Sequence, residues 1–420
     1  MSAGCVNGKE NLLMQAKRRW FQFSLRSLLV LLLVASAGLG YFAYLRRVSR
    51  LQWEATRAIS EAGGDFRILS SSRGTNLEGF ATGPSWQKGL GIDLPPYRVL
   101  VVDGATSPRP PDWGRVVELL PQLPQLEKIA VRKEAVTDAD LRMLSRMPRL
   151  NFLEVSSDQI TDAGLTCLAE NSKLSELRLA GFQLTDLGLA NVAGIKGLKS
   201  LTWNATQTTE HGLSHLKGHP SLVSLSIQAD VVTDAGVEHL STCEKLESLY
   251  LNHFGKLTRA GVEPLARLKQ LRLLTLRQMT FSEDGLAALA GLTSLELLTL
   301  DAKLSSEELA YLAPLTSLKY LNLSETDLTS EGLLHLAGLK NLQELGAGMS
   351  ALQDEDVQVL CSLSELEDLN LRRSRLTDAG LLNLANHKGL RRIYLSGTQV
   401  TAAGVVKFKA LAPSVQVDWP

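Results

Sequence analysis

The sequence predicts an α/β solenoid of about twelve strand–helix units, each 24 residues long, preceded by one transmembrane helix. Three observations support this: a Thr-Asp-Ala-Gly-Leu phrase recurs at a nearly fixed interval, each interval contains strand spacing followed by helix spacing, and one long uncharged run lies near the start. The apolar share of 45% and charged share of 21% are typical of a folded chain. The net charge is zero, so we expect no nucleic-acid partner.

Residues 1–27 form a short basic N-terminal segment, and residues 28–45 form the predicted transmembrane helix. This run holds eighteen residues without a charge and would span about 27 Å, close to the roughly 30 Å of a bilayer core. Arginines and aromatic residues flank it on both sides. A cleaved signal peptide with its site at residues 35–37 is the alternative, but the apolar run continues past that point. We therefore expect a single-pass anchor with the lipid bilayer as a partner. A short first segment usually stays inside, which places the repeats on the extracytoplasmic side.

Residues 46–125 are expected to contain a juxtamembrane helix, a linker and an N-terminal cap. The juxtamembrane helix should cover residues 46–62, because two glycines follow and stop it. Residues 70–96 are rich in Ser, Gly and Pro and are typical of a linker. A strand at residues 97–102 should cap the solenoid, since an open solenoid end leaves apolar surface and an unpaired strand edge. A short strand is also conceivable at residues 66–69.

Residues 126–417 form the predicted solenoid. The first half of a unit reads Leu-x-x-Leu-x-Leu, and the spacing of two between Leu177 and Leu179 is strand periodicity. The second half has apolar residues at helix spacing, as in Leu189 and Val192. One unit cannot bury enough surface to fold alone, so neighbouring units must stack. Residues 415–417 should form the last strand. The recurring Thr, or its equivalent, stands at positions 137, 161, 185, 209, 233, 258, 282, 305, 329, 353, 377 and 401.

The start of each predicted helix has its own signature. A Thr or Ser stands at the junction in eleven of twelve units, where its oxygen can accept a backbone N–H, and Ser305 with Glu308 has capping-box spacing. The next residue is acidic in eight of twelve units, where it favours the positive end of the helix. A glycine follows the Thr position by three residues in nine units. Because glycine inside a helix costs about 1 kcal/mol relative to alanine, we predict that neighbouring helices approach closely there.

These repeats resemble the leucine-rich-repeat family over residues 126–417, in the helix-backed subgroup shared by ribonuclease-inhibitor-like proteins and F-box receptors. Residues 23–26, before the apolar run, resemble the start of bacterial single-pass proteins that bear such repeats. The resemblance implies a concave parallel sheet and convex helices. It also suggests, as an alternative function, the substrate-recognition subunit of a ubiquitin-ligase-like complex, although no F-box segment is apparent. The family's frequent Asn at the strand exit is replaced here, for example by Phe182 and Thr206.

The sequence contains no motif that indicates catalysis or a cofactor: a Walker loop, H-E-x-x-H and paired C-x-x-C are all missing. We therefore predict a protein that is not an enzyme and needs no cofactor and no metal. His211, His215 and His219 are spaced by four and could gather a metal, but a solvated helix face is the simpler explanation and the one we adopt. The irregular region 63–125 has four aspartates and no histidine, and an active site there is the remaining enzymatic alternative.

The concave strand face is the predicted binding surface. Side chains between the strand leucines point to this face, whereas Trp203 occupies a leucine position and is predicted to lie in the core. Tyr and Arg are enriched at interface hot spots, so we predict a membrane-tethered scaffold that binds a protein or peptide here. A solvated face on a non-catalytic structural surface protein is the alternative. The predicted binding residues are Tyr250, Tyr320, Asn322, Asp368, Asn370, Arg372, Arg392 and Tyr394.

Overall fold

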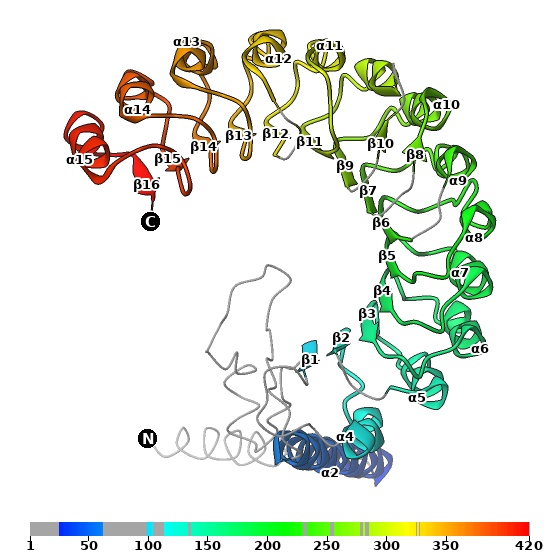
Figure 1. Cartoon of the computed structure of the whole chain (residues 1–420). Helices are drawn as coiled ribbons and strands as arrows, with labels where there is room; N and C mark the ends of the chain where they lie inside the picture. Colours follow the sequence, from blue (N-terminus) through cyan, green and yellow to red (C-terminus); the bar gives the residue numbers. More distant parts are fainter. Residues whose placement is uncertain are drawn as a thin grey trace, which may run out of the picture.

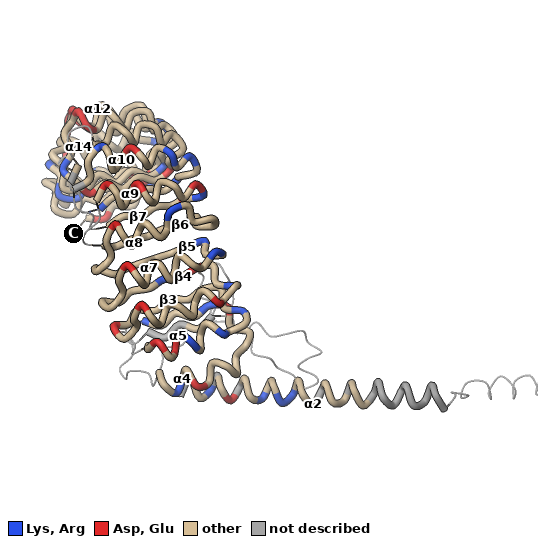
Figure 2. The backbone as a smooth tube through the Cα atoms, turned by 90° about the vertical axis from the view of Figure 1, so that its right-hand side faces the viewer, with Lys and Arg blue, Asp and Glu red and all other residues tan. Residues whose placement is uncertain are grey.

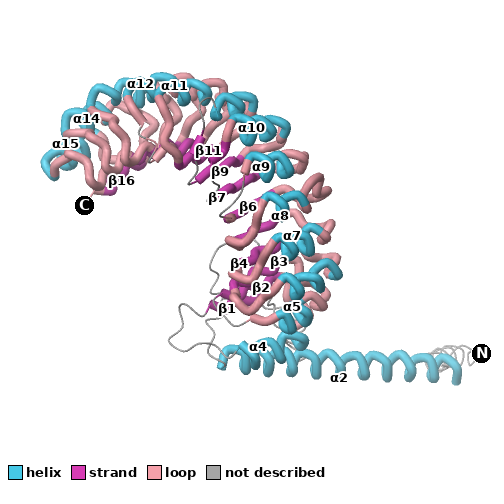
Figure 3. Tube along the Cα trace, turned by 45° about the vertical axis from the view of Figure 1, so that its right-hand side comes forward, coloured by secondary structure: helices cyan, strands magenta, loops and turns pink. Residues whose placement is uncertain are grey.

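The protein folds as a curved solenoid in which a parallel sheet lines the concave side and helices cover the convex side (Figures 1 and 3). This is the architecture that the repeat predicts. A computed structural model describes residues 25–61, 99–103, 113–132, 136–229, 233–252, 256–277, 280–281, 285–324, 326 and 328–419.

The strands form one 14-stranded sheet in which every neighbouring pair is parallel, and β8 and β10 form a separate two-stranded sheet. Sheet order follows chain order throughout, because each strand leads through one helical segment to the strand beside it. The strands are β1 Val99–Asp103, β2 Lys128–Arg132, β3 Phe152–Ser156, β4 Glu176–Ala180, β5 Ser200–Asn204, β6 Ser224–Gln228, β7 Ser248–Asn252, β8 Lys256–Leu257, β9 Leu273–Arg277, β10 Thr280–Phe281, β11 Leu297–Asp301, β12 Tyr320–Asn322, β13 Glu344–Gly346, β14 Asp368–Asn370, β15 Arg392–Tyr394 and β16 Gln416–Asp418.

Short helices return the chain from the end of one strand to the start of the next. Most have only one or two turns, because a unit of 24 residues leaves room for no more. The α-helices are α2 Leu25–Glu61, α4 Trp113–Leu119, α5 Asp138–Leu144, α6 Asp162–Leu165, α7 Asp186–Ala193, α8 Glu210–Ser214, α9 Asp234–Leu240, α10 Arg259–Val262, α11 Ser306–Leu309, α12 Ser330–His335, α13 Val357–Cys361, α14 Asp378–Leu384 and α15 Ala402–Leu411. The 3₁₀ helices are η2 Leu120–Gln122, η3 Thr166–Glu170, η4 Glu263–Arg267, η5 Gly285–Gly291, η6 Ala310–Leu312 and η7 Asp354–Asp356.

Helix α2 joins two segments that the sequence analysis treated separately. The predicted transmembrane segment 28–45 and the juxtamembrane helix both lie in this one helix, which ends at Glu61. Its C-terminal part packs against α4 and η2 and buries Ala55 and Ile59 in the core, so it caps the first unit. Figure 2 shows α2 crossing the end of the solenoid beside α4 and continuing past it.

The membrane assignment of residues 28–45 stays a prediction. In the residues with described placement, no helix combines the length and the apolar character that crossing a membrane requires. The segment 1–24 and the side chains of residues 25–35 lie outside the described part, as do the proposed linker at 70–96 and the strand considered at 66–69. The two capping strands are confirmed, because β1 pairs in parallel with β2 at one end and β16 pairs with β15 at the other.

The repeat period sets the register of the sheet. Leu177 on β4 pairs with Leu201 on β5, which in turn pairs with Leu225 on β6, so equivalent leucines stack in columns. These side chains are fully or almost fully buried and belong to one continuous core. Trp203 is also buried, as predicted, and its indole Nε1 donates to Thr208 Oγ1 at 2.7 Å, which satisfies the only polar atom of the ring.

A ladder of Thr–Asp contacts joins successive units behind the strands. The Asp138 carboxylate accepts two hydrogen bonds from Thr161 of the next unit, from the backbone N at 2.9 Å and from Oγ1 at 2.7 Å. Several Thr side chains also cap their own helices, as predicted. Two-point contacts of the same kind join Asp162 to Thr185, Asp186 to Thr209, Asp234 to Thr258, Asp354 to Thr377 and Asp378 to Thr401.

The recurring glycine makes room for this ladder. A Cβ atom on Gly164 would lie 2.1 Å from Asp138 Oδ1, and one on Gly404 would lie 2.0 Å from Asp378 Oδ1. The predicted close approach is therefore confirmed, and at six of these glycines the neighbouring group is the Asp carboxylate of the preceding unit; at Gly332 it is the Leu309 side chain. The aspartate of the ladder lies in the first turn of its own helix, as expected. In addition, it accepts two hydrogen bonds from the following unit, and these stabilise the stack.

Candidate protein-binding face

The concave face consists of columns of side chains that project between the buried leucines. In the strands, residues alternate between the two faces of the sheet, and parallel pairing places equivalent residues side by side. Tyr320, Glu344, Asp368 and Arg392 therefore form one column across β12 to β15. The adjacent column over the same strands contains Asn322, Gly346, Asn370 and Tyr394, and it ends at Asp418 on β16.

Four predicted residues and Asp418, which was not predicted, meet at the C-terminal end of this face. We call these five residues, Asp368, Arg372, Arg392, Tyr394 and Asp418, the C-terminal cluster. Arg392 Nε lies 3.5 Å from Asp368 Oδ1, and its Nη1 donates to the hydroxyl of Tyr394 at 3.1 Å. The guanidinium of Arg372 lies over the Tyr394 ring at 4.6 Å and also pairs with Asp418 at 2.5 Å. Both arginines are thus held in place while remaining exposed.

Glu344 borders the C-terminal cluster and was not among the predicted residues. Burial and the neighbouring Asp368 carboxylate raise the pKa of Glu344, while Arg392 opposes this shift. Hydrogen bonding to Tyr394 and the nearby carboxylates raise the pKa of Arg392, so this guanidinium stays charged. The carboxylates of Glu344 and Asp368 therefore share the nearby positive charge of Arg392.

The other predicted residues contribute differently. Tyr320 and Asn322 lie on β12, two strands from Asp368 on β14. The Asn322 amide oxygen accepts the backbone N–H of Ser324, and the Asn370 amide oxygen accepts the backbone N–H of Arg372 in the same way. Their amides therefore shape the strand exits. Tyr250 is separate: it lies on β7, and β9 and β11 stand between it and β12, a distance of roughly 14 Å at the usual strand spacing.

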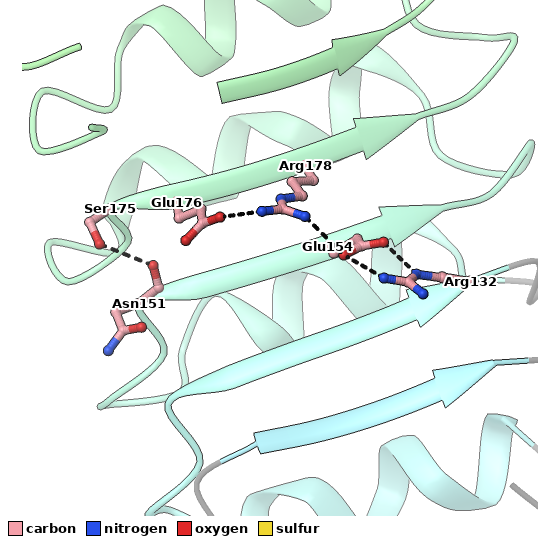
Figure 4. Close-up of polar contacts among 6 residues, drawn as sticks. All are labelled: Arg132, Asn151, Glu154, Ser175, Glu176 and Arg178. Atoms are coloured by element: carbon pink, nitrogen blue, oxygen red, sulfur yellow. Dashed lines mark hydrogen bonds and ion pairs between the residues drawn. The ribbon is translucent and has the colours of Figure 1, made fainter. Parts of the chain in front are cut away.

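A second charged cluster lies at the other end of the concave face, and the sequence analysis missed it. Figure 4 shows Arg132 of β2, Glu154 of β3 and Glu176 and Arg178 of β4 linked by ion pairs across three strands. These residues occupy the same alternating strand positions as the predicted ones. Extending the register back to the first full units would have found them.

The three histidines considered earlier, and two of the cysteines, serve packing and local hydrogen bonding. The rings of His211 and His215 meet edge to face with centroids 5.5 Å apart, whereas His219 is buried and bonded to the carbonyl of Ile195. Within the described part of the chain, no three metal-binding side chains converge. Burial raises the pKa of the Cys243 and Cys361 thiols, so both stay protonated at neutral pH.

Comparisons with known proteins agree with this architecture. The family described as Leucine Rich repeat matches residues 315–337, and a search of curated proteins finds no match. An internalin from Listeria monocytogenes has a similar structure with 22% identity; the match covers 76% of this chain and 86% of that chain, with a TM-score of 0.53. At this identity, the likeness shows the fold alone.

Two further solved structures are similar at a greater distance. A leucine-rich-repeat protein from Leptospira interrogans is 17% identical over 72% of this chain and 91% of its own, with a TM-score of 0.38. A chain from the yeast complex of Rad7 and Elc1 is 18% identical over 67% of this chain and 83% of its own, with a TM-score of 0.42. Both scores are too low to carry an argument about function.

Proposed function

We propose that this leucine-rich-repeat protein is a non-catalytic scaffold that binds a protein or peptide on its concave face, with the C-terminal cluster at the centre of the contact. We further propose that residues 28–45 tether it to a membrane, with the repeats on the extracytoplasmic side. Solenoids of this kind commonly use their extended concave surface for binding.

The observation that carries the proposal is the preorganised Arg–Tyr network of the C-terminal cluster. Arg392 is exposed, yet its guanidinium is oriented by Asp368 and by the Tyr394 hydroxyl. Arg372 is oriented by the Tyr394 ring and by Asp418. Side chains that are already ordered lose less conformational entropy on binding, and Tyr and Arg are the residue types that most often dominate binding energy.

The membrane tether is supported by the sequence and by the course of α2. Residues 28–45 carry no charge and have arginines on both sides, a pattern typical of a bilayer-spanning segment. The exposed side chains of Leu39, Tyr41 and Tyr44 lie in this segment, away from the buried Ala55 and Ile59. Large apolar side chains that the solenoid leaves uncovered are compatible with a lipid environment.

Affinity capture tests the binding proposal. The full-length chain in mild detergent is immobilised, and bound proteins are quantified by mass spectrometry for wild type, Arg392→Ala and Tyr394→Ala. The matched control is Ser226→Ala, a concave-face residue on β6 outside the cluster. We expect wild type and the control to capture one or more partners in equal amounts. The captured amount should fall about tenfold or more with either cluster variant, because hot-spot truncations cost about 2 kcal/mol. Equal capture by wild type, the two cluster variants and the control would refute the role of this cluster.

Fractionation tests the tether independently. The full-length chain should sediment with membranes after carbonate washing and be released by detergent. A variant with Leu31 and Leu32 replaced by Arg should appear in the wash, because a charge at the bilayer centre costs about 2.5–3.5 kcal/mol. Protease added to intact cells should then degrade the repeats if they are extracytoplasmic. Release of the wild-type chain by carbonate alone would count against the tether.

A further inference from the structure

The structure contains a second charged zone on the concave face, hereafter the N-terminal zone (Lys128, Arg132, Phe152, Glu154, Glu176 and Arg178). Arg132 makes two hydrogen bonds to Glu154, at 2.5 and 3.2 Å. Arg178 binds Glu176 at 2.8 Å and lies 4.0 Å from Glu154. The Glu154 side chain is only 16% exposed, because the two arginines cover it from the neighbouring strands.

Phe152 lies between two cations in this zone. The Arg178 guanidinium is 5.2 Å from the ring centroid, and the Lys128 ammonium is 5.7 Å from it. Both distances are within the range of cation–π attraction. The half-exposed ring is therefore fixed beside Lys128, and the side of the zone that faces a partner is ordered before binding.

The cations of the N-terminal zone are not all paired with carboxylates. Strands β2 to β4 contribute three cations and two carboxylates, and both carboxylates are bound by the arginines. Among the described residues, no carboxylate oxygen lies within 4.0 Å of the Lys128 ammonium, whose contact is the Phe152 ring. The Lys128 ammonium thus has no ion-pair partner in the described part of the chain and lies beside an aromatic surface.

The N-terminal zone is also separate from the C-terminal cluster. The first three of the intervening strands, β5 to β7, present only uncharged side chains to the concave face, so a partner's charges have nothing to pair with on them; β9 and β11 then add Arg277 and Asp301. The uncharged residues are Ser200, Thr202, Asn204, Ser224, Ser226, Gln228, Ser248, Tyr250 and Asn252.

We propose that the N-terminal zone binds an acidic side chain of the protein partner, with the carboxylate on Lys128 and its aliphatic stem on Phe152. This inference rests on the proposed scaffold function and adds the chemistry of the partner at one end of the face. A carboxylate there gives the ammonium an ion-pair partner, and a charge-assisted hydrogen bond to the ammonium is stronger than one between neutral groups. Because Arg132 and Arg178 are already bound to acids, the binding position is set by Lys128.

Binding of defined peptides tests this inference without knowledge of the natural partner. The probes are two fluorescein-labelled peptides of about twelve residues, one alternating Glu with Gly and the other alternating Gln with Gly. Each carries a photo-crosslinking group at its centre. Fluorescence anisotropy with the full-length chain in detergent at low salt should show tighter binding of the Glu peptide, about threefold or more. Cross-links mapped by mass spectrometry should fall on β2 to β4.

Variants separate recognition by Lys128 from non-specific attraction. Lys128→Glu should abolish the preference for the Glu peptide, Lys128→Arg should keep it, and Phe152→Ala should weaken it. Lys388→Glu, at an exposed site elsewhere, makes the same charge change and should leave the preference intact. Equal affinity for the two peptides, unchanged binding by Lys128→Glu, or cross-links outside the zone would each overturn the inference.

Failure of this inference and failure of the proposed C-terminal binding site would give different results. Arg392→Ala and Tyr394→Ala should leave binding of the Glu peptide unchanged, because they lie at the other end of the sheet. If the peptide tests succeed and partner capture is insensitive to those variants, the C-terminal assignment fails alone. If capture depends on Arg392 while Lys128→Glu has no effect on either assay, the N-terminal assignment fails alone.

Discussion

Replacing Gly164 by alanine should destabilise the protein, although the same change in an ordinary helix is stabilising. The added Cβ would lie 2.1 Å from Asp138 Oδ1 and 2.5 Å from its Cγ, so the carboxylate must move by about 1 Å. That movement breaks its hydrogen bonds to the backbone N and Oγ1 of Thr161, at 2.9 and 2.7 Å. The contact between two successive units is lost with them.

The loss in the free energy of unfolding can be calculated from those two hydrogen bonds. Hydrogen bonds to a charged group contribute about 1.5–3 kcal/mol each, and the lower value applies because Asp138 is only half-buried. Two such bonds give about 3 kcal/mol, and the better helix propensity of alanine offsets about 1 kcal/mol. We therefore expect Gly164→Ala to lower the free energy of unfolding by about 2 kcal/mol, measured by urea unfolding followed by circular dichroism.

Two comparisons decide whether the reasoning holds. Gly338 has no atom within 4 Å of its added Cβ, so Gly338→Ala should be neutral or stabilising by up to about 1 kcal/mol. In an Asp138→Ala background, Gly164→Ala should lose most of its cost, because the clashing carboxylate is gone and only a contact at 3.0 Å remains. The same cost in both backgrounds, or a Gly164→Ala protein as stable as Gly338→Ala, would refute the ladder as the cause.

Three further predictions concern the core and titrating groups. Trp203 is fully buried, so Trp203→Ala should lower the free energy of unfolding by about 3–5 kcal/mol. Phe182 is 66% exposed, so Phe182→Ala should change it by at most about 0.5 kcal/mol. Urea unfolding measures both changes. Burial lowers the pKa of His219 from its usual value of 6.5. As the pH falls through that value, the unfolded chain therefore binds more protons than the folded chain, and the folded state loses stability. His219→Asn removes this group, so the fall in Tm between about pH 7.5 and 5.5 should become flatter. Burial and the Asp368 carboxylate raise the pKa of Glu344, so its ionised form is unfavourable in the folded state. Glu344→Gln should therefore raise Tm at neutral pH. This gain should shrink as the pH falls through the Glu344 pKa, because the wild-type carboxyl then becomes neutral as well.

The units could be predicted from the sequence because the period itself carries the information. Strand and helix spacing recur within every 24 residues, and stacking is the only way for such units to bury their leucines. Ser305 and Glu308 were also predictable, since a capping box joins residues three apart, and the structure contains it. Contacts within a unit can be inferred from local spacing.

Contacts between units were harder to predict. The Asp138 carboxylate bonds Thr161, 23 residues away, and that pairing depends on the rise and rotation from one unit to the next. The sequence alone fixes neither quantity, so it placed the acid at the start of its own helix but did not identify its partner in the next unit. The same limit explains Tyr250, whose distance from Tyr320 becomes evident only when the intervening strands β9 and β11 are placed.

The structure separates the residues that make the fold from those that can make a binding site. The leucine columns recur in every unit because every unit must stack on the next, and the Thr–Asp contacts join six pairs of units in the same way. The concave columns contribute little to stacking, so they change from Lys128 and Phe152 at one end, through serines, to Arg392 and Tyr394 at the other. Substitutions in the concave columns should therefore alter recognition while leaving the solenoid folded. This separation makes a loss of binding by Arg392→Ala or Lys128→Glu attributable to the surface itself.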